Sequence, residues 1–241
     1  MGRKLRPGRC VYCLRYSDDL TSDHAPPKSW YADTTPIGIE KWQVPACRKC
    51  NSDYGKIERR LLVRLGLCID PADPRSQGVA DRAVRSVDPS VAKGQADRTH
   101  RAALREKVRR EIRPAEFAHV LPGFQGPGGP LGQLALPIRR DDLKSLAEKL
   151  VRAITYVASG AYIDSDYQIE VFFLDAVKAE PINELISRYG EELQRGPMRV
   201  RRAVVPQDAS TALVSIEVWG RLTMHAVVRR KTATIEARRN A

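Results

Sequence analysis

Two pairs of cysteines constrain this chain more than any other feature. Four of its five cysteines form Cys10-x-x-Cys13 and Cys47-x-x-Cys50. Two residues between thiolates is the spacing at which a knuckle presents both sulfurs to one tetrahedral zinc ion. A redox pair would explain one such motif but not a matching second one. The pattern therefore predicts a structural Zn²⁺ held by all four cysteines, with further structure built between the two knuckles.

The cellular compartment that we expect for this chain favours zinc binding by these cysteines over disulfide formation. The N-terminus is basic and is followed by no apolar segment of the kind found in a secretory signal. No apolar run approaches the roughly 20 residues that a membrane span requires. We therefore expect a cytoplasmic protein without a membrane partner, where thiols stay reduced. The fifth cysteine, Cys68, is expected to pack in the core.

Positive charge is concentrated in the first half of the sequence. Residues 1–113 carry 24 Lys and Arg against 14 Asp and Glu, whereas residues 114–241 carry 17 against 15. A basic half beside a nearly neutral half indicates a polyanionic partner, and DNA is the partner we expect. A solvated basic surface that keeps the protein soluble is the alternative.

The distribution of apolar and turn-forming residues divides the chain into three parts. Residues 1–69 form the cysteine-bearing module and end in a helix whose apolar stripe is Ile57, Leu61, Leu65 and Cys68. Residues 70–137 form a basic connector, which is helical after Thr99 and ends in a segment where eight of the eleven residues 122–132 are Gly or Pro. Residues 138–241 form a third part of unknown function.

The third part has the pattern of an α+β domain. A helix is predicted from Asp141-Asp142 to Gly160, and a second helix is predicted to open at Pro181 and to carry Leu193 on its apolar face. Strands are predicted over 168–174 and 199–205. Apolar residues then alternate from Val214 to Val228 without losing phase at Gly220, which indicates one bent strand or two strands. The fold expected for the whole chain is α+β, with an antiparallel sheet following a treble-clef-like zinc module and a helical connector.

A second motif occupies the insert between the cysteine pairs. It comprises Asp23-His24, Pro26 and Lys28-Ser29, then Pro45-Ala46-Cys47 and Cys50-Asn51. In residue type, order and spacing, these positions resemble the HNH endonuclease family, in the form whose ββα-metal motif is clamped by a four-cysteine zinc site. The resemblance is confined to residues 10–56.

The resemblance implies a metal-dependent endonuclease that cleaves DNA. It assigns Asp23 and Asn51 as ligands of a catalytic Mg²⁺ or Mn²⁺, and His24 as the general base. The chemistry supports these roles independently, because carboxylate and amide oxygens suit a hard cation and a histidine titrates near neutral pH. Arg48, Lys49 and Lys56 are expected to hold flanking phosphates. Each of these three could instead be an ordinary exposed charge.

One position departs from the family pattern. The family's middle Asn, nine residues before Asn51, is replaced by Trp42, with Gln43 next to it. Either Gln43 supplies the missing hydrogen bond or packing of Trp42 holds the loop; otherwise the site is weakened or inactive.

Each proposed site residue also has a simpler interpretation. His24 could be a packed strand residue, Asp23 a turn residue and Asn51 only a helix N-cap. Two further functions thus stay open: a zinc module that binds nucleic acid without cleaving it, and a regulatory or interaction protein that acts through residues 138–241. The sequence contains no signal for the target DNA or for the oligomeric state.

Overall fold

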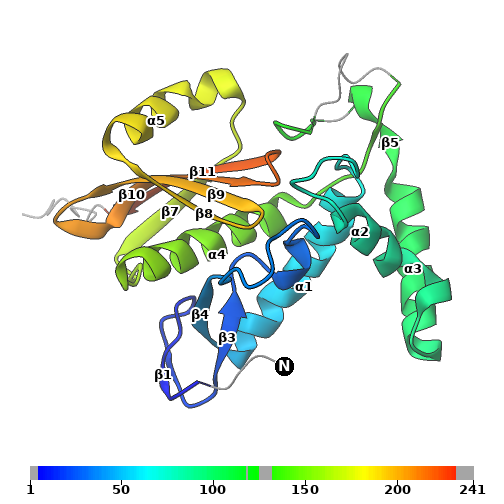
Figure 1. Ribbon diagram of the computed structural model, residues 1–241, viewed down its shortest axis with the longest axis horizontal. Helices are drawn as coiled ribbons and strands as arrows, with labels where there is room; N and C mark the ends of the chain where they lie inside the picture. Colours follow the sequence, from blue (N-terminus) through cyan, green and yellow to red (C-terminus); the bar gives the residue numbers. More distant parts are fainter. Residues whose placement is uncertain (1–4, 118, 125–131, 232–241) are drawn as a thin grey trace, which may run out of the picture.

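The computed structural model describes residues 5–117, 119–124 and 132–231. It has an α+β fold in which an antiparallel five-stranded sheet lies beside a small N-terminal module and a helical connector (Figure 1). Part of the predicted Gly- and Pro-rich linker, residues 125–131, falls outside the described residues.

The N-terminal module is a pair of short hairpins followed by a long helix. Its elements are β1 (Gly8–Arg9), β2 (Tyr16–Ser17), β3 (Leu20–His24), the 3-10 turn η1 (Lys28–Trp30), β4 (Gln43–Cys47) and α1 (Arg48–Gly66). β1 pairs with β2, and β3 pairs with β4, both antiparallel. The predicted helix is confirmed, and Leu61 and Leu65 of its stripe are buried.

The prediction that Cys68 continues the apolar stripe of this helix was wrong. Cys68 lies beyond the end of α1 and is exposed, whereas the neighbouring Ile69 is buried. The backbone leaves the helix after Gly66, so helical spacing no longer determines which side chain faces the core.

The connector contains two helices rather than the one that was predicted. Its elements are α2 (Val79–Val87), η2 (Pro89–Val91), α3 (Gln95–Glu111), β5 (Arg113–Pro114), η3 (Ala115–Phe117) and β6 (Leu134–Ala135). α3 begins at Gln95, ahead of the expected start after Thr99. Val63, Val87 and Val108 form a small separate apolar cluster that attaches α3 to the helices before it. In Figure 1, α3 stands at the side of the molecule away from the sheet.

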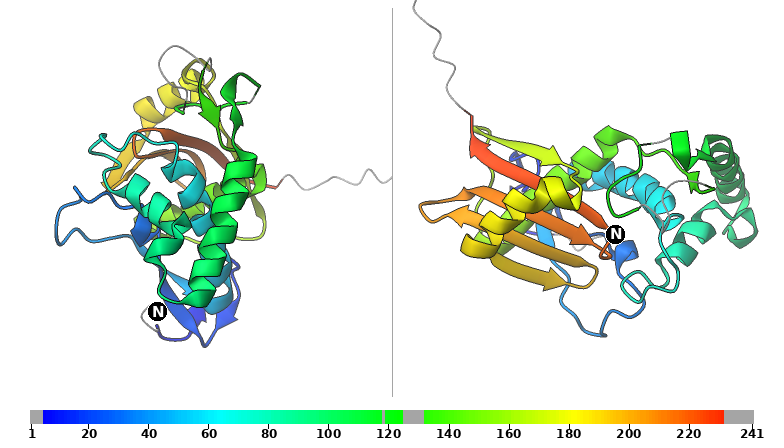
Figure 2. Two further views of the ribbon diagram at one scale, coloured as in Figure 1. Left: turned by 90° about the vertical axis from the view of Figure 1, so that its right-hand side faces the viewer. Right: turned by 90° about the horizontal axis from the view of Figure 1, so that it is seen from above.

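The C-terminal part is a sheet covered by one helix on each face. Its elements are α4 (Arg140–Ser159), β7 (Tyr167–Phe172), α5 (Ala176–Tyr189), β8 (Glu191–Arg195), β9 (Met198–Val205), β10 (Asp208–Val218) and β11 (Leu222–Arg230). The strand order is β7-β11-β10-β9-β8, with every pair antiparallel. α5 lies across one face of the sheet, as Figure 2 shows from above, and α4 lies on the other (Figure 1).

Alternation along β10 and β11 determines which face is the core. The predicted alternating segment forms two strands, with Trp219 and Gly220 at the turn and Val218 opposite Leu222. Because each strand keeps its phase through the turn, both contribute their even-numbered residues to one buried face. The helix predicted from Asp141-Asp142 to Gly160 is confirmed as α4; it packs against this face, and its C-cap Gly160 has a left-handed conformation.

The second predicted helix of this part was placed wrongly at both ends. α5 begins at Ala176, because Asp175 caps it by accepting a hydrogen bond from the Lys178 amide, and Pro181 lies inside the helix. The helix ends at Tyr189. Leu193, assigned to its apolar face, belongs instead to the edge strand β8.

One continuous apolar core connects the N-terminal module to the sheet. Cys10, Val44 and Leu61 of the module belong to the same buried cluster as Leu150 of α4 and Ile216 of β10. The three sequence segments are therefore not three separate cores. Among the helices of the described residues, none is long and apolar enough to cross a membrane.

Candidate metal centre and the ββα site

The four cysteines of the two pairs meet at one point. Cys10 and Cys13 come from the turn between β1 and β2, while Cys47 and Cys50 come from the end of β4 and the first turn of α1. Their sulfur atoms all lie within 4.8 Å of one another, and Cys13 Sγ is 3.8 Å from Cys47 Sγ. Four free thiols gathered in this way can hold a metal ion such as zinc.

Burial affects the charge that the cluster can carry. Burial raises the pKa of the Cys10 thiol, whose side chain is fully buried. A divalent cation would supply the positive charge that buried thiolates need. The Cys47 sulfur also accepts a hydrogen bond from the Cys50 amide at 3.5 Å, which caps α1 and fixes the second knuckle.

The β3–β4 hairpin brings Asp23 and Asn51 to the same side of β3. Thr21 and Asp23 share one face of β3, and Ser22 and His24 share the other. Asn51 Nδ2 on α1 donates a hydrogen bond to Thr21 Oγ1 at 2.9 Å, so the Thr21 face is the one directed to the helix. Asn51 is not the N-cap of α1, a role that belongs to Cys47; it lies within the first turn.

Asp23 is buried and has partners that sequence reasoning missed. Tyr12 OH donates to Asp23 Oδ2 at 2.6 Å, and Lys149 Nζ of α4 lies 2.8 Å from the same oxygen. Lys149 also forms an ion pair with Glu58 of α1. We call these four residues the Asp23–Lys149 cluster. No local pattern marks Lys149 as a site residue, because it reaches Asp23 only once α4 has packed against the module.

Burial dominates the electrostatics of the cluster. Lys149 is completely buried, and Asp23 and Glu58 are exposed by only 7% and 8%. Burial raises the pKa of Glu58 to about 7, although the attraction of Lys149 acts in the opposite direction. The cluster thus contains one ammonium between two carboxyl groups, one of which binds a proton easily near neutral pH.

His24 ends β3 and is half-buried. Burial, followed by the positive charges of Lys28 and Lys41, lowers the pKa of its imidazole, against the opposing effect of Asp23. The lowered pKa favours the neutral imidazole, which is the form that accepts a proton. Its backbone carbonyl accepts a hydrogen bond from Lys149 at 3.4 Å.

Trp42 and Gln43, the two residues considered in place of the family's middle Asn, both contact the segment that carries His24. Trp42 is buried, and its carbonyl accepts a hydrogen bond from the Ala25 amide at 3.0 Å. Gln43 lies opposite His24 in the hairpin, and its side chain accepts a hydrogen bond from Ser22 Oγ. Trp42 thus holds the chain directly after His24, while Gln43 is tied to the strand that carries it.

The three predicted phosphate-binding residues lie on the exposed surface of α1. Arg48 pairs with Asp19 at 2.6 Å, and Lys49 and Lys56 pair with Asp53 at 2.6 and 3.3 Å. Exposed ion pairs of this kind are weak, so their cations stay available to an anion.

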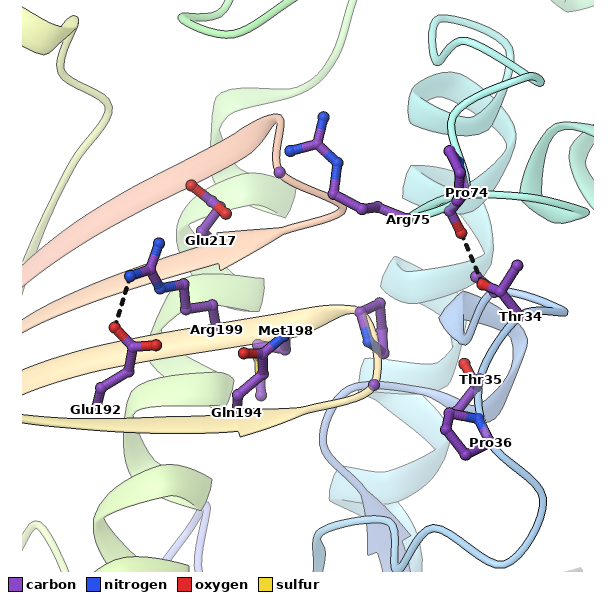
Figure 3. Close-up of a pocket in the computed structure, with 14 residues that line it drawn as sticks. Thr34, Thr35, Pro36, Pro74, Arg75, Glu192, Gln194, Met198, Arg199 and Glu217 are labelled. Carbon is purple, nitrogen blue, oxygen red and sulfur yellow. Dashed lines mark hydrogen bonds and ion pairs between the residues drawn. The ribbon is translucent and has the colours of Figure 1, made fainter.

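Two cavities lie apart from the candidate site residues Asp23, His24 and Asn51. One, of about 590 Å³, opens between the tips of the sheet hairpins and the loops at Thr34 and Pro74; in Figure 3, Arg75 and Glu217 face each other across it. The other, of about 840 Å³, is mainly apolar and is lined by residues that include Cys68 and His119. Neither cavity is lined by Asp23, His24 or Asn51.

Comparison of the chain with family models, with curated proteins and with solved structures gives no match.

Proposed function

We propose that this protein is a metal-dependent endonuclease that hydrolyses DNA phosphodiester bonds in its N-terminal module. The observation that carries the proposal is the arrangement of the β3–β4 hairpin against α1. It sets Asn51 against Thr21, on the face of β3 that also carries Asp23, while His24 follows Asp23 at the end of the strand and starts from the other face.

The oxygen atoms left over by the protein's own hydrogen bonds fit a hard cation. Tyr12 and Lys149 both contact Oδ2 of Asp23, and within the described residues no hydrogen bond engages Oδ1. Asn51 uses its Nδ2 on Thr21, which leaves its amide oxygen to accept. Bound Mg²⁺ or Mn²⁺ would neutralise charge developing on the phosphate and assist the leaving oxygen.

His24 acts as the general base in this proposal. Its lowered pKa keeps the ring neutral, so one ring nitrogen can take the proton of the attacking water. Gln43 and Trp42 hold the two ends of the segment that carries His24 and limit its movement.

The surface of α1 suits a bound phosphate backbone. The helix begins at Arg48, and Asn51 lies in its first turn, at the positive end of the helix dipole. Arg48, Lys49 and Lys56 add positive charge along the same helix. They would hold flanking phosphates without reading the base sequence.

A second function, binding of nucleic acid without cleavage, is favoured by one observation. Lys149 Nζ lies 2.8 Å from Asp23, and this ammonium already neutralises the carboxylate that would hold the cation. If Lys149 never yields Asp23, the module retains its zinc clamp and basic surface but does not cut.

A plasmid-cleavage assay tests the proposal and separates the two functions. Wild type, His24→Ala and the matched control His100→Ala, which removes an exposed histidine of α3, are compared in metal-free buffer and after addition of Mg²⁺ or Mn²⁺. We expect metal-dependent cleavage by wild type and the control, and none by His24→Ala at unchanged zinc content. Cleavage retained by His24→Ala would remove the assigned base. Salt-sensitive binding without cleavage by any variant would favour the binding function.

A further inference from the structure

Lys149 belongs to the C-terminal part of the chain, yet its charge lies at the centre of the N-terminal site. Its side chain is fully buried, and its ammonium contacts Oδ2 of Asp23 at 2.8 Å and Oε1 of Glu58. It also lies 5.6 Å from the ring centroids of Tyr12 and Tyr54. A buried ammonium requires such compensation, because desolvation of an unpaired charge is very unfavourable.

The ammonium of Lys149 contacts Asp23, which is the carboxylate that would hold the cation in the proposed reaction. Two cations on one carboxylate repel each other, and the repulsion is strong where water is excluded. A divalent ion at Asp23 must therefore bind against the charge of Lys149. Asn51, the second proposed ligand, does not offset this repulsion, because its amide carries no charge.

Glu58 gives Lys149 a second anionic partner. With Glu58 ionised, Lys149 can keep one ion pair when the carboxylate of Asp23 turns to a metal ion. In the structure, Lys149 is shared by Asp23 and Glu58. With a cation bound to Asp23, Lys149 would pair with Glu58 alone.

We propose that Lys149 is a positioning residue that competes with the catalytic cation for Asp23 and so determines the metal concentration at which the site loads. This inference rests on the proposed function, in which Asp23 is a metal ligand. Glu58 assists loading because it keeps an anionic partner beside Lys149 when Asp23 binds the cation. Since Lys149 comes from α4, the C-terminal part of the chain thereby controls metal binding in the N-terminal module.

Direct Mn²⁺ binding to the full-length, zinc-loaded protein tests the competition without reference to cleavage. Free Mn²⁺ is measured by electron paramagnetic resonance for wild type, Lys149→Met and Lys149→Met/Asp23→Asn. Lys144→Met is the matched control, because it removes an exposed lysine of the same helix whose ion pair, with Glu148 at 3.8 Å, does not involve Asp23. We expect Lys149→Met to lower the Kd for Mn²⁺ at least tenfold, the added Asp23→Asn change to abolish that gain, and Lys144→Met to bind as wild type does.

Glu58→Gln gives an independent test that leaves Lys149 in place. Without its second partner, Lys149 should pair more firmly with Asp23, so Mn²⁺ binding should weaken relative to wild type. This variant also covers the case in which Lys149→Met does not fold.

The outcomes separate this inference from the proposed function. Equal Mn²⁺ affinity in wild type and Lys149→Met, or a gain that persists after Asp23→Asn, overturns the competition. If Lys149→Met fails to fold, unchanged or tighter binding by Glu58→Gln overturns it. A gain that depends on Asp23, together with no DNA cleavage by any variant, supports the competition and overturns the nuclease.

Discussion

The contact between Trp30 and Trp219 provides the sharpest test of whether the module and the sheet are one folding unit. Trp219 lies at the β10–β11 turn and Trp30 ends η1 of the module. Both are buried, at 1% and 0% exposure, and their ring centroids are 4.8 Å apart. Trp219 Nε1 also donates to the Trp30 carbonyl at 2.7 Å. We predict that Trp219→Ala destabilises both parts of the protein together.

The expected loss is large compared with the stability of an ordinary domain. Truncating a buried Trp to Ala costs about 3–5 kcal/mol through lost burial and the cavity that remains. The Trp30 carbonyl would also lose its indole donor, at a further cost of about 1 kcal/mol. A loss of about 4–6 kcal/mol is comparable to the whole stability of a marginal domain, since such values lie at about 5–15 kcal/mol.

Urea unfolding followed by two probes measures the effect. Far-ultraviolet circular dichroism reports the helices and the sheet, and release of zinc to a chromogenic chelator reports the module. Both midpoints should coincide in wild type and should fall together in Trp219→Ala. The control is Tyr189→Ala, which removes an aromatic ring that is 65% exposed and should change stability by less than about 0.5 kcal/mol. Zinc release that keeps its wild-type midpoint in Trp219→Ala would refute the shared core as the source of coupling.

Three further predictions follow from the site. Cys47→Ser should reduce zinc content below one ion per chain by atomic absorption and lower the thermal midpoint, because structural zinc contributes about 10–16 kcal/mol of binding free energy; full zinc retention would exclude Cys47 as a ligand. Burial raises the pKa of Glu58 from 4.5 to about 7, so between these pH values the folded state binds more protons than the unfolded state. The free energy of unfolding should therefore fall as the pH rises from 4.5 to about 7, by up to about 3 kcal/mol. Glu58→Gln should flatten this slope in denaturant titrations at pH 5 and pH 8, and an unchanged slope would show that another group causes it. If DNA is cleaved, the rate should fall in acid with a midpoint below pH 6.5, because burial and Lys28 lower the pKa of His24 from its ordinary value of 6.5; a midpoint above 6.5 would contradict His24 as the base.

Local patterns were sufficient for much of the fold and for the metal centre. The spacing within each cysteine pair predicted the four-sulfur cluster that can hold zinc, because a knuckle is formed by neighbouring residues. Periodicities of 3.6 and 2 predicted α1, α4 and the buried face of the segment that forms β10 and β11, since each depends only on which side chains share a face, whereas the alternation did not distinguish one bent strand from two strands. The same patterns failed at the ends of two helices. Asp175 capped α5 ahead of Pro181, and α1 ended before Cys68 could continue its stripe.

The sequence by itself thus determined the hairpin and helix whose four cysteines can hold a metal ion such as zinc, and it supplied the residues from which nuclease chemistry was predicted, because those signals lie within a few residues of one another. Only the tertiary structure decided that the module and the sheet share one core, joined by Trp30 and Trp219. It also placed Lys149 between Asp23 and Glu58. The physical reason is the same in both cases. Burial of a ring or of a charge depends on partners distant in the chain, and no local periodicity encodes which distant surfaces will meet.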